Sequence, residues 1–207
     1  MYMQRAFCAT RRVPQGLPIC NKSIFKSYFT TAASKDQDLI HRLDLRVGKI
    51  VQVDQHPQAD HLYVEKVDVG EQTQDGVSHV RTIVSGLVKF IDAKDMLNKQ
   101  VVVVGNMKPS KFRGVLSEGM LLAASKENIV ELLEPAAGSI VGERVQIDTM
   151  HELGQPDAVL KPKQRVMELV AADLCTDTSC IATWKNTALK TSAGFVRCKS
   201  IENGIIS

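Results

Sequence analysis

From residue 43 onward, apolar and polar side chains alternate along the chain with a period of two. The run from 43 to 53 places Asp44 and Arg46 at polar positions between apolar neighbours, as in a strand with one buried face. Gly48 interrupts this run, and a glycine inside a strand often marks a bulge or a sharp barrel bend. The pattern predicts a protein built mainly from β-strands.

Similar runs recur over the next eighty residues or so. Strands are predicted at 63–69, 79–84, 101–104, 115–124 and 129–133, and a short helix at 87–97. The run at 101–104 is entirely apolar and β-branched, which suits a strand buried on both faces. Short strands with one helix between the third and the fourth are typical of the oligonucleotide-binding fold (OB-fold), a five-stranded, partly open Greek-key barrel.

The first 38 residues have a different composition. They hold six Lys and Arg residues against two Asp, and none of the first 35 is acidic. A basic, hydroxyl-rich, acid-free start is typical of a mitochondrial transit peptide, so we expect a leader at 1–38 and a protein of the mitochondrial matrix. The alternative is a disordered basic tail that helps to hold RNA, on a cytoplasmic protein.

The net charge of +3 comes mainly from this leader. Residues 39–148 hold 13 basic and 15 acidic side chains, and residues 149–207 hold seven and six. Overall charge is therefore no argument for a nucleic-acid partner, and such an argument depends on where the charges lie. No stretch approaches the roughly 18 consecutive apolar residues of a membrane span, so no membrane partner is expected.

One segment concentrates positive charge. Residues 96–117 contain no Asp or Glu at all, and Lys108, Lys111 and Arg113 fall within six residues on the loop after the apolar run. Pro109 stiffens this loop, and loops on a rigid barrel are where binding residues concentrate. Lys and Arg held in this way recognise phosphates. Because only 5% of the residues are aromatic, we expect grip on an RNA backbone and its shape rather than the reading of a long sequence.

Five short motifs carry a resemblance to a known family. They are LDLRVG at 43–48, HPQADHL at 56–62, VSGL at 84–87, NMKP at 106–109 and RGVLS at 113–117. Together they resemble the tRNA-binding module of the endothelial-monocyte-activating polypeptide family. That family also covers C-terminal domains of some methionyl- and tyrosyl-tRNA synthetases and free-standing tRNA-binding cofactors.

The resemblance continues beyond the barrel. Residues 161–165, 172–174, 180–185 and 197–198 are similar to the C-terminal region of the polypeptide's own branch, which packs on the barrel where bacterial relatives dimerise. The resemblance implies an OB-fold tRNA-binding domain at 39–148. It also implies a small α+β extension at 149–207 that substitutes for a dimer interface, and therefore a monomer.

By the same resemblance, tRNA contacts come from the basic loop and the adjoining barrel face. Matched by position, the contacts are Arg46, Ser85, Asn106, Lys108, Lys111, Arg113, Ser117 and Met120. A second basic cluster, which either helps to hold tRNA or is only solvated, consists of Lys161, Lys163 and Arg165.

Nothing in the sequence indicates catalysis. The chain has no Walker loop, GxGxxG or HExxH motif, and the spacing of GVLSEG at 114–119 is wrong for a nucleophile elbow. Cys175, Cys180 and Cys198 lack the CxxC pairing of a zinc site, so we expect thiols, no metal and no cofactor. We therefore predict a non-catalytic protein that binds tRNA and delivers it to one aminoacyl-tRNA synthetase. The alternatives are a synthetase-docking or cytokine-like module with incidental RNA binding, or a piece of a longer synthetase.

Overall fold

The structure is a computed structural model that describes residues 39–148 and 154–207. All of these residues belong to one unit of the chain. The predicted leader at 1–38 lies outside the described residues, as does the segment at 149–153 that begins the predicted extension. Among the described residues, no helix is both long enough and apolar enough to cross a membrane.

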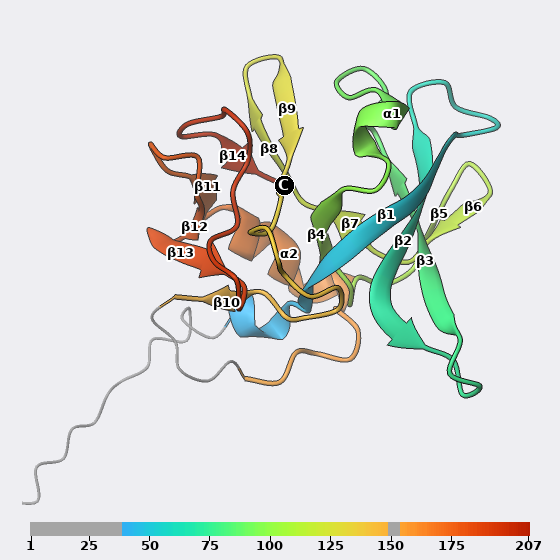
Figure 1. Ribbon diagram of the computed structural model, residues 1–207, viewed down its shortest axis with the longest axis horizontal. Helices are drawn as coiled ribbons and strands as arrows, with labels where there is room; N and C mark the ends of the chain where they lie inside the picture. The colour runs from blue at the N-terminus through green and yellow to red at the C-terminus, as the bar shows by residue number, and fades with distance from the viewer. Residues whose placement is uncertain (1–38, 149–153) are drawn as a thin grey trace, which may run out of the picture. The chain divides into compact units, whose positions relative to one another are not determined.

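The first half of the described chain, after a 3-10 helix η1 (Ile40–Arg42), forms a curled antiparallel sheet (Figure 1). Its strands lie in the order β3 (Ser78–Ser85), β2 (Tyr63–Gln72), β1 (Leu45–Gln55), β4 (Gln100–Val104) and β7 (Met120–Leu121). Between β3 and β4 the chain forms a short helix, α1 (Ala93–Met96). The predicted OB-fold is confirmed.

The two edges of this sheet approach each other and close the barrel in part. The backbone N–H of Glu118 donates to the carbonyl of Thr82 on β3, with an N–O distance of 2.8 Å. The hydroxyl of Ser117 accepts from the N–H of Val84 at 3.1 Å. This edge therefore closes through a few bonds rather than a full ladder, which leaves a surface between β3 and the residues that follow β4.

Strand β4 separates two hydrophobic cores. Val101 and Val103 face the barrel interior, where they join residues such as Ile50 and Ile83. Val102 and Val104 face the opposite way, into a second core shared with the C-terminal part of the chain. All four valines are fully buried, so the prediction of a strand buried on both faces is confirmed.

Seven further strands form a second antiparallel sheet. Its order is β10 (Gln146–Ile147), β13 (Thr187–Lys190), β12 (Ala182–Trp184), β11 (Leu174–Thr176), β14 (Ile205–Ile206), β8 (Ala123–Lys126) and β9 (Ile129–Leu132). A 3-10 helix η2 (Pro162–Gln164) and the helix α2 (Val166–Ala171) precede β11. Because β14 pairs with β8, this sheet takes strands from both sides of residue 149.

Several predicted elements differ in detail. The predicted helix at 87–97 is helical only at Ala93–Met96, since residues 88–90 form a turn. The predicted strand at 115–124 is three strands, with breaks at 118–119 and at 122. Within the first break, a Cβ at Gly119 would lie 3.1 Å from the carbonyl of Val104. The bulge of β1 lies between Ile50 and Gln52. Gly48 instead allows close packing, since a Cβ there would lie 2.8 Å from the side chain of Val103.

Candidate nucleic-acid interface

The basic segment is not an open loop but a β-hairpin. Strands β5 (Ser110–Phe112) and β6 (Val115–Ser117) pair with each other, and Arg113 and Gly114 form the two-residue turn between them. Both turn residues have positive φ, 45° and 92°, which is the signature of a type I′ turn that matches the twist of a hairpin. We call residues 108–117 the basic hairpin.

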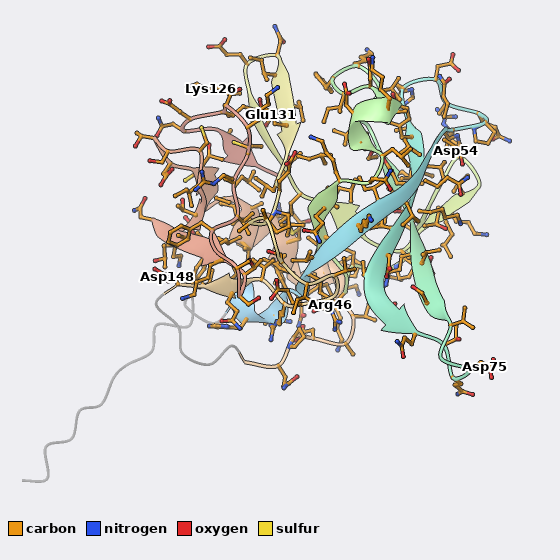
Figure 2. All side chains as sticks on the ribbon, viewed as in Figure 1. Arg46, Asp54, Asp75, Lys126, Glu131 and Asp148 are labelled. Carbon is orange, nitrogen blue, oxygen red and sulfur yellow. The ribbon has the colours of Figure 1, made fainter. Side chains whose placement is uncertain are left out.

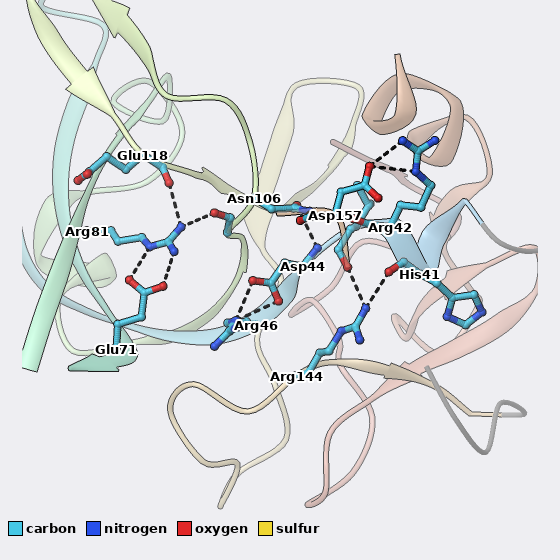
Figure 3. A network of polar contacts seen from close by, with 12 residues as sticks. His41, Arg42, Asp44, Arg46, Glu71, Arg81, Asn106, Glu118, Arg144 and Asp157 are labelled. Atoms are coloured by element: carbon cyan, nitrogen blue, oxygen red, sulfur yellow. Dashed lines mark hydrogen bonds and ion pairs between the residues drawn. The ribbon is translucent and has the colours of Figure 1, made fainter. Parts of the chain in front are cut away.

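Arg81 on β3 holds both ends of the segment that carries the basic hairpin (Figure 3). Its guanidinium donates to the backbone carbonyl of Gly105, before the hairpin, and to that of Glu118, after it, at 3.2 Å. The same group is oriented by the carboxylate of Glu71 on β2. Hydrogen bonding to Arg81 lowers the pKa of Glu71, against the opposing effect of its partial burial.

A second contact fixes the middle of the hairpin. His56 is buried, and its Nδ1 accepts the backbone N–H of Gln58 at 3.1 Å. Its Nε2 is 3.0 Å from the carbonyl of Phe112. Since Nδ1 is an acceptor, the ring proton is on Nε2 and is donated to Phe112. The hairpin is thus tied to the turn after β1, which restricts where its cations can lie.

A groove of about 500 Å³ lies between the basic hairpin, the end of β3 and β7. Four of the predicted contact residues line it: Ser85, Lys108, Ser117 and Met120. Ser117 is buried and uses its hydroxyl to bond Val84 and the carbonyl of Gly119, so its contribution is to hold the wall in place.

Lys111 and Arg113 lie on the same hairpin but do not line the groove. Lys111 is opposite Leu116 in the β5–β6 ladder, so both point away from the face that Ser110 and Phe112 present to the groove. Both cations are exposed, as is Lys108. Within the described part of the chain, none of the three side chains has an ion pair or a hydrogen bond. They are therefore available to a phosphate.

The structure places the other two predicted contacts elsewhere. Arg46, near the start of β1 (Figure 2), is bound to Asp44 with Nε 2.9 Å from both carboxylate oxygens. Asn106 is 5% exposed. Its amide donates to the carbonyls of Arg42 and Asp157, both at 2.8 Å, and accepts the N–H of Asp44 at 3.0 Å. Asn106 thus joins η1 to the extension instead of facing solvent.

The second basic cluster lies next to the hairpin. The N–H of Leu160 donates to the carbonyl of Asn106 at 2.8 Å, which brings the chain just before Lys161 beside the chain just before Lys108. Lys161, Lys163 and Arg165 are all exposed on and around η2. The hairpin cations and the cluster around η2, which are far apart in sequence, therefore follow backbone segments that are adjacent in the fold.

Comparison with known proteins identifies this arrangement. Residues 45–144 match the family described as "Putative tRNA binding domain". The solved C-terminal domain of Plasmodium vivax p43 is 34% identical and superposes with a TM-score of 0.76, covering 82% of this chain and 99% of that domain. The chain belongs to this tRNA-binding domain family. It shares its mainly β architecture with the p43 domain.

The tRNA-binding domain is shared with synthetases and their associated proteins. The cytoplasmic tyrosine–tRNA ligase of Gallus gallus is 47% identical over 169 residues, which are 80% of this chain and 31% of the ligase. The aminoacyl tRNA synthase complex-interacting multifunctional protein 1 of Mus musculus is 42% identical over 177 residues, which are 84% of this chain and 54% of that protein. The chain thus spans 31% to 54% of the length of these relatives.

Three residues of this tRNA-binding domain were not identified from the sequence. Arg81 and His56 hold the hairpin, and Glu65 on β2 lies under the groove, fully buried. Burial raises the pKa of Glu65 to about 7, although a hydrogen bond from the hydroxyl of Ser85 opposes this effect. The only signal in the sequence was a Glu at an inward position of the alternating run at 63–69. Such a position is normally apolar.

The three cysteines of the extension are free thiols. Burial raises the pKa of the Cys198 thiol to about 11, so this side chain is inert at neutral pH. Across the described residues, no group of three or more His, Cys, Asp or Glu side chains is arranged to hold a metal ion.

Proposed function

We propose that this chain is a non-catalytic tRNA-binding protein that grips the RNA backbone with the basic hairpin and delivers tRNA to an aminoacyl-tRNA synthetase. The observation that carries the proposal is a set of three cations, which have no side-chain partner among the described residues, on a hairpin whose two ends are held by Arg81. Cations on a backbone that is already held in place meet phosphates at a lower ordering cost than cations on a free loop. The synthetase partner rests on the domain shared with tyrosine–tRNA ligases and the complex-interacting protein.

Binding of the full chain to total deacylated tRNA across a salt series tests the proposal. If three or four phosphates are neutralised, log K falls against log salt with a slope of roughly −2 to −4. A triple variant, Lys108→Ala, Lys111→Ala and Arg113→Ala, is expected to lose most of the affinity and to flatten the slope.

A charge-matched control removes three exposed cations from other parts of the surface: Lys94→Ala, Arg197→Ala and Lys199→Ala. None of these lines the groove. Equal loss in both triple variants would mean that overall charge, not the hairpin, binds tRNA. An absence of tRNA binding by the unmodified chain would reject the proposal and favour a protein-docking module.

We further propose that the chain is a monomer, because its own C-terminal part covers the outer face of the barrel. Leu45 and Val47 on β1 and Val102 on β4 share one core with Trp184 and Leu189 of the extension. These apolar side chains cover the outer face of β4 and of the first half of β1, where a second copy would otherwise pack. Light scattering coupled to size exclusion tests this, and a concentration-dependent dimer would contradict it.

A further inference from the structure

The groove contains features that a grip on phosphates does not require. Two phenylalanines line it: Phe112 from β5 and Phe90 from the turn before α1. Their exposed fractions are 44% and 47%, although large apolar side chains are usually buried. Exposed aromatic rings beside cations are the surfaces on which unpaired nucleobases stack, and this stacking tolerates any base.

We call Ser85 and the buried Glu65 carboxylate to which it is bonded the polar wall of the groove. This wall can accept hydrogen bonds from a ligand but cannot donate them. Ser85 lines the groove, and its hydroxyl donates to Oε1 of Glu65. A serine hydroxyl has one proton, so its oxygen can offer the groove only lone pairs. A ligand that bonds to Ser85 must therefore be a donor, as an N–H of a base or a ribose 2′-hydroxyl is.

Glu65 maintains this direction from beneath the groove. Its side chain is 0% exposed, and its second oxygen, Oε2, has no hydrogen-bond partner among the described residues. Burying a polar atom without a hydrogen-bond partner costs free energy, so a buried Glu65 with an unpartnered oxygen needs a compensating role. That role is to keep the hydroxyl of Ser85 oriented toward the barrel interior.

The groove volume limits what can enter. About 500 Å³ lies within the range of small-molecule sites. It is room for a nucleotide and its phosphate but not for an RNA duplex. Lys108, on the same wall, places a free cation beside the aromatic surface.

We propose that this groove is a site for one unpaired nucleotide, with its base on Phe90 and Phe112, its phosphate at Lys108, and a donor group of the nucleotide on the oxygen of Ser85. Glu65 is a positioning residue that acts through Ser85. This inference rests on the proposed tRNA binding and adds to it a place where a single unpaired nucleotide is held.

A short single-stranded RNA that cannot form a duplex tests the site directly. The full chain is titrated with a fluorescent RNA hexamer, and Phe112→Ala is compared with Leu116→Ala. Leu116 is exposed to almost the same extent, 43%, but lies on the other face of the hairpin. Phe112→Ala is expected to weaken hexamer binding about tenfold, and Leu116→Ala to leave it unchanged.

Variants of the polar wall distinguish the two possible donors. If the 2′-hydroxyl donates, Ser85→Ala removes a preference for the RNA hexamer over the DNA hexamer of the same sequence. If a base N–H donates, Ser85→Ala removes a preference among adenine, cytosine and uracil hexamers instead. Glu65→Leu is expected to remove the same preference as Ser85→Ala, because leucine offers the hydroxyl of Ser85 no acceptor and leaves its proton free to turn toward the groove. Thermal unfolding of each variant verifies that it is folded.

The outcomes separate this inference from the function on which it rests. Binding of tRNA but not of the hexamer, or equal hexamer binding by both hairpin variants, would overturn the nucleotide site and leave the tRNA function in place. If Ser85→Ala and Glu65→Leu both kept every preference of the unmodified chain, the role of the polar wall would be overturned. A chain that binds neither RNA would reject both proposals.

Discussion

Arg81 on β3 donates hydrogen bonds to both carboxylate oxygens of Glu71 on β2, one of them at 3.0 Å. Glu71 thereby fixes the plane of a guanidinium whose remaining nitrogen donates to the carbonyls on either side of the basic hairpin. An arginine has five donors in a rigid fork, so one side chain can serve the carboxylate and both carbonyls together. The position of the hairpin thus depends on an ion pair of the barrel wall.

Replacement of Arg81 by alanine is expected to loosen the hairpin at both ends. The loss of charge-assisted hydrogen bonds at a part-buried site should lower the free energy of unfolding by about 2 kcal/mol. Affinity for tRNA should also fall, because the three hairpin cations would no longer be held in place. Urea unfolding and tRNA titration measure the two effects. Arg197→Ala, which removes an exposed arginine, is the control, and equal effects of the two changes would contradict the prediction.

Because the pKa of Glu65 is raised in the folded chain, its contribution to the free energy of unfolding is expected to decrease as the pH rises. Its pKa in the folded chain is about 7, against about 4.3 when it is unfolded, so the native state binds the extra proton between these values. The stabilisation is complete below about pH 4.3 and is lost as the pH rises through 7. Glu65→Gln, which is always neutral, should therefore gain stability relative to the unmodified chain on going from pH 5 to pH 8, by up to roughly 3 kcal/mol. Chemical unfolding at the two pH values measures this, and a pH-independent difference would contradict it.

Asn106 is expected to be important for stability rather than for direct RNA contact. Its amide donates to two carbonyls, which a carboxylate cannot do, so Asn106→Asp should cost about 3 kcal/mol. The tRNA affinity of the folded fraction should fall only modestly, because the hairpin cations remain. Unfolding curves and binding at low temperature separate the two effects. A stable Asn106→Asp variant with strongly reduced affinity would instead indicate a direct contact.

The cluster around η2 is expected to add to the hairpin. Changing Lys161, Lys163 and Arg165 together to alanine should weaken tRNA binding several-fold. It should also make the salt slope shallower by about 1 for each phosphate that is no longer neutralised. The backbone hydrogen bond between Leu160 and Asn106 places these cations beside the hairpin. Unchanged affinity and slope would show that the cluster is only solvated.

The proposal that residues 1–38 are a transit peptide can be tested separately. Residues 1–38 fused to a fluorescent protein should direct it to mitochondria, because the segment is basic and hydroxyl-rich. Replacement of Arg5, Arg11 and Arg12 by glutamate should abolish import, since the positive charge would be removed. A diffuse cytosolic signal from the unmodified fusion would favour the alternative of a basic tail.

Individual elements show which parts of the fold the local sequence pattern can predict. The valine run at 101–104 predicted a strand buried on both faces, and Val102 and Val103 indeed face two different cores. Period-two alternation and β-branched side chains are local properties, so they can be read directly from the chain. The basic hairpin (108–117) was missed because its lysines and phenylalanine do not form an alternating pattern, and its turn requires a positive φ at Arg113, which is rare for arginine.

The sequence by itself determined the mainly β barrel, the acid-free segment with its three cations and the likeness to the tRNA-binding family. It also indicated Ser85, Lys108, Ser117 and Met120, which the fold brings to one groove. Only the tertiary structure decided that Arg81 holds the hairpin, that Asn106 is buried and that Glu65 lies beneath Ser85. These roles come from contacts between residues 10 to 64 positions apart. Such contacts depend on how strands pair and pack, and no local pattern of side chains specifies them.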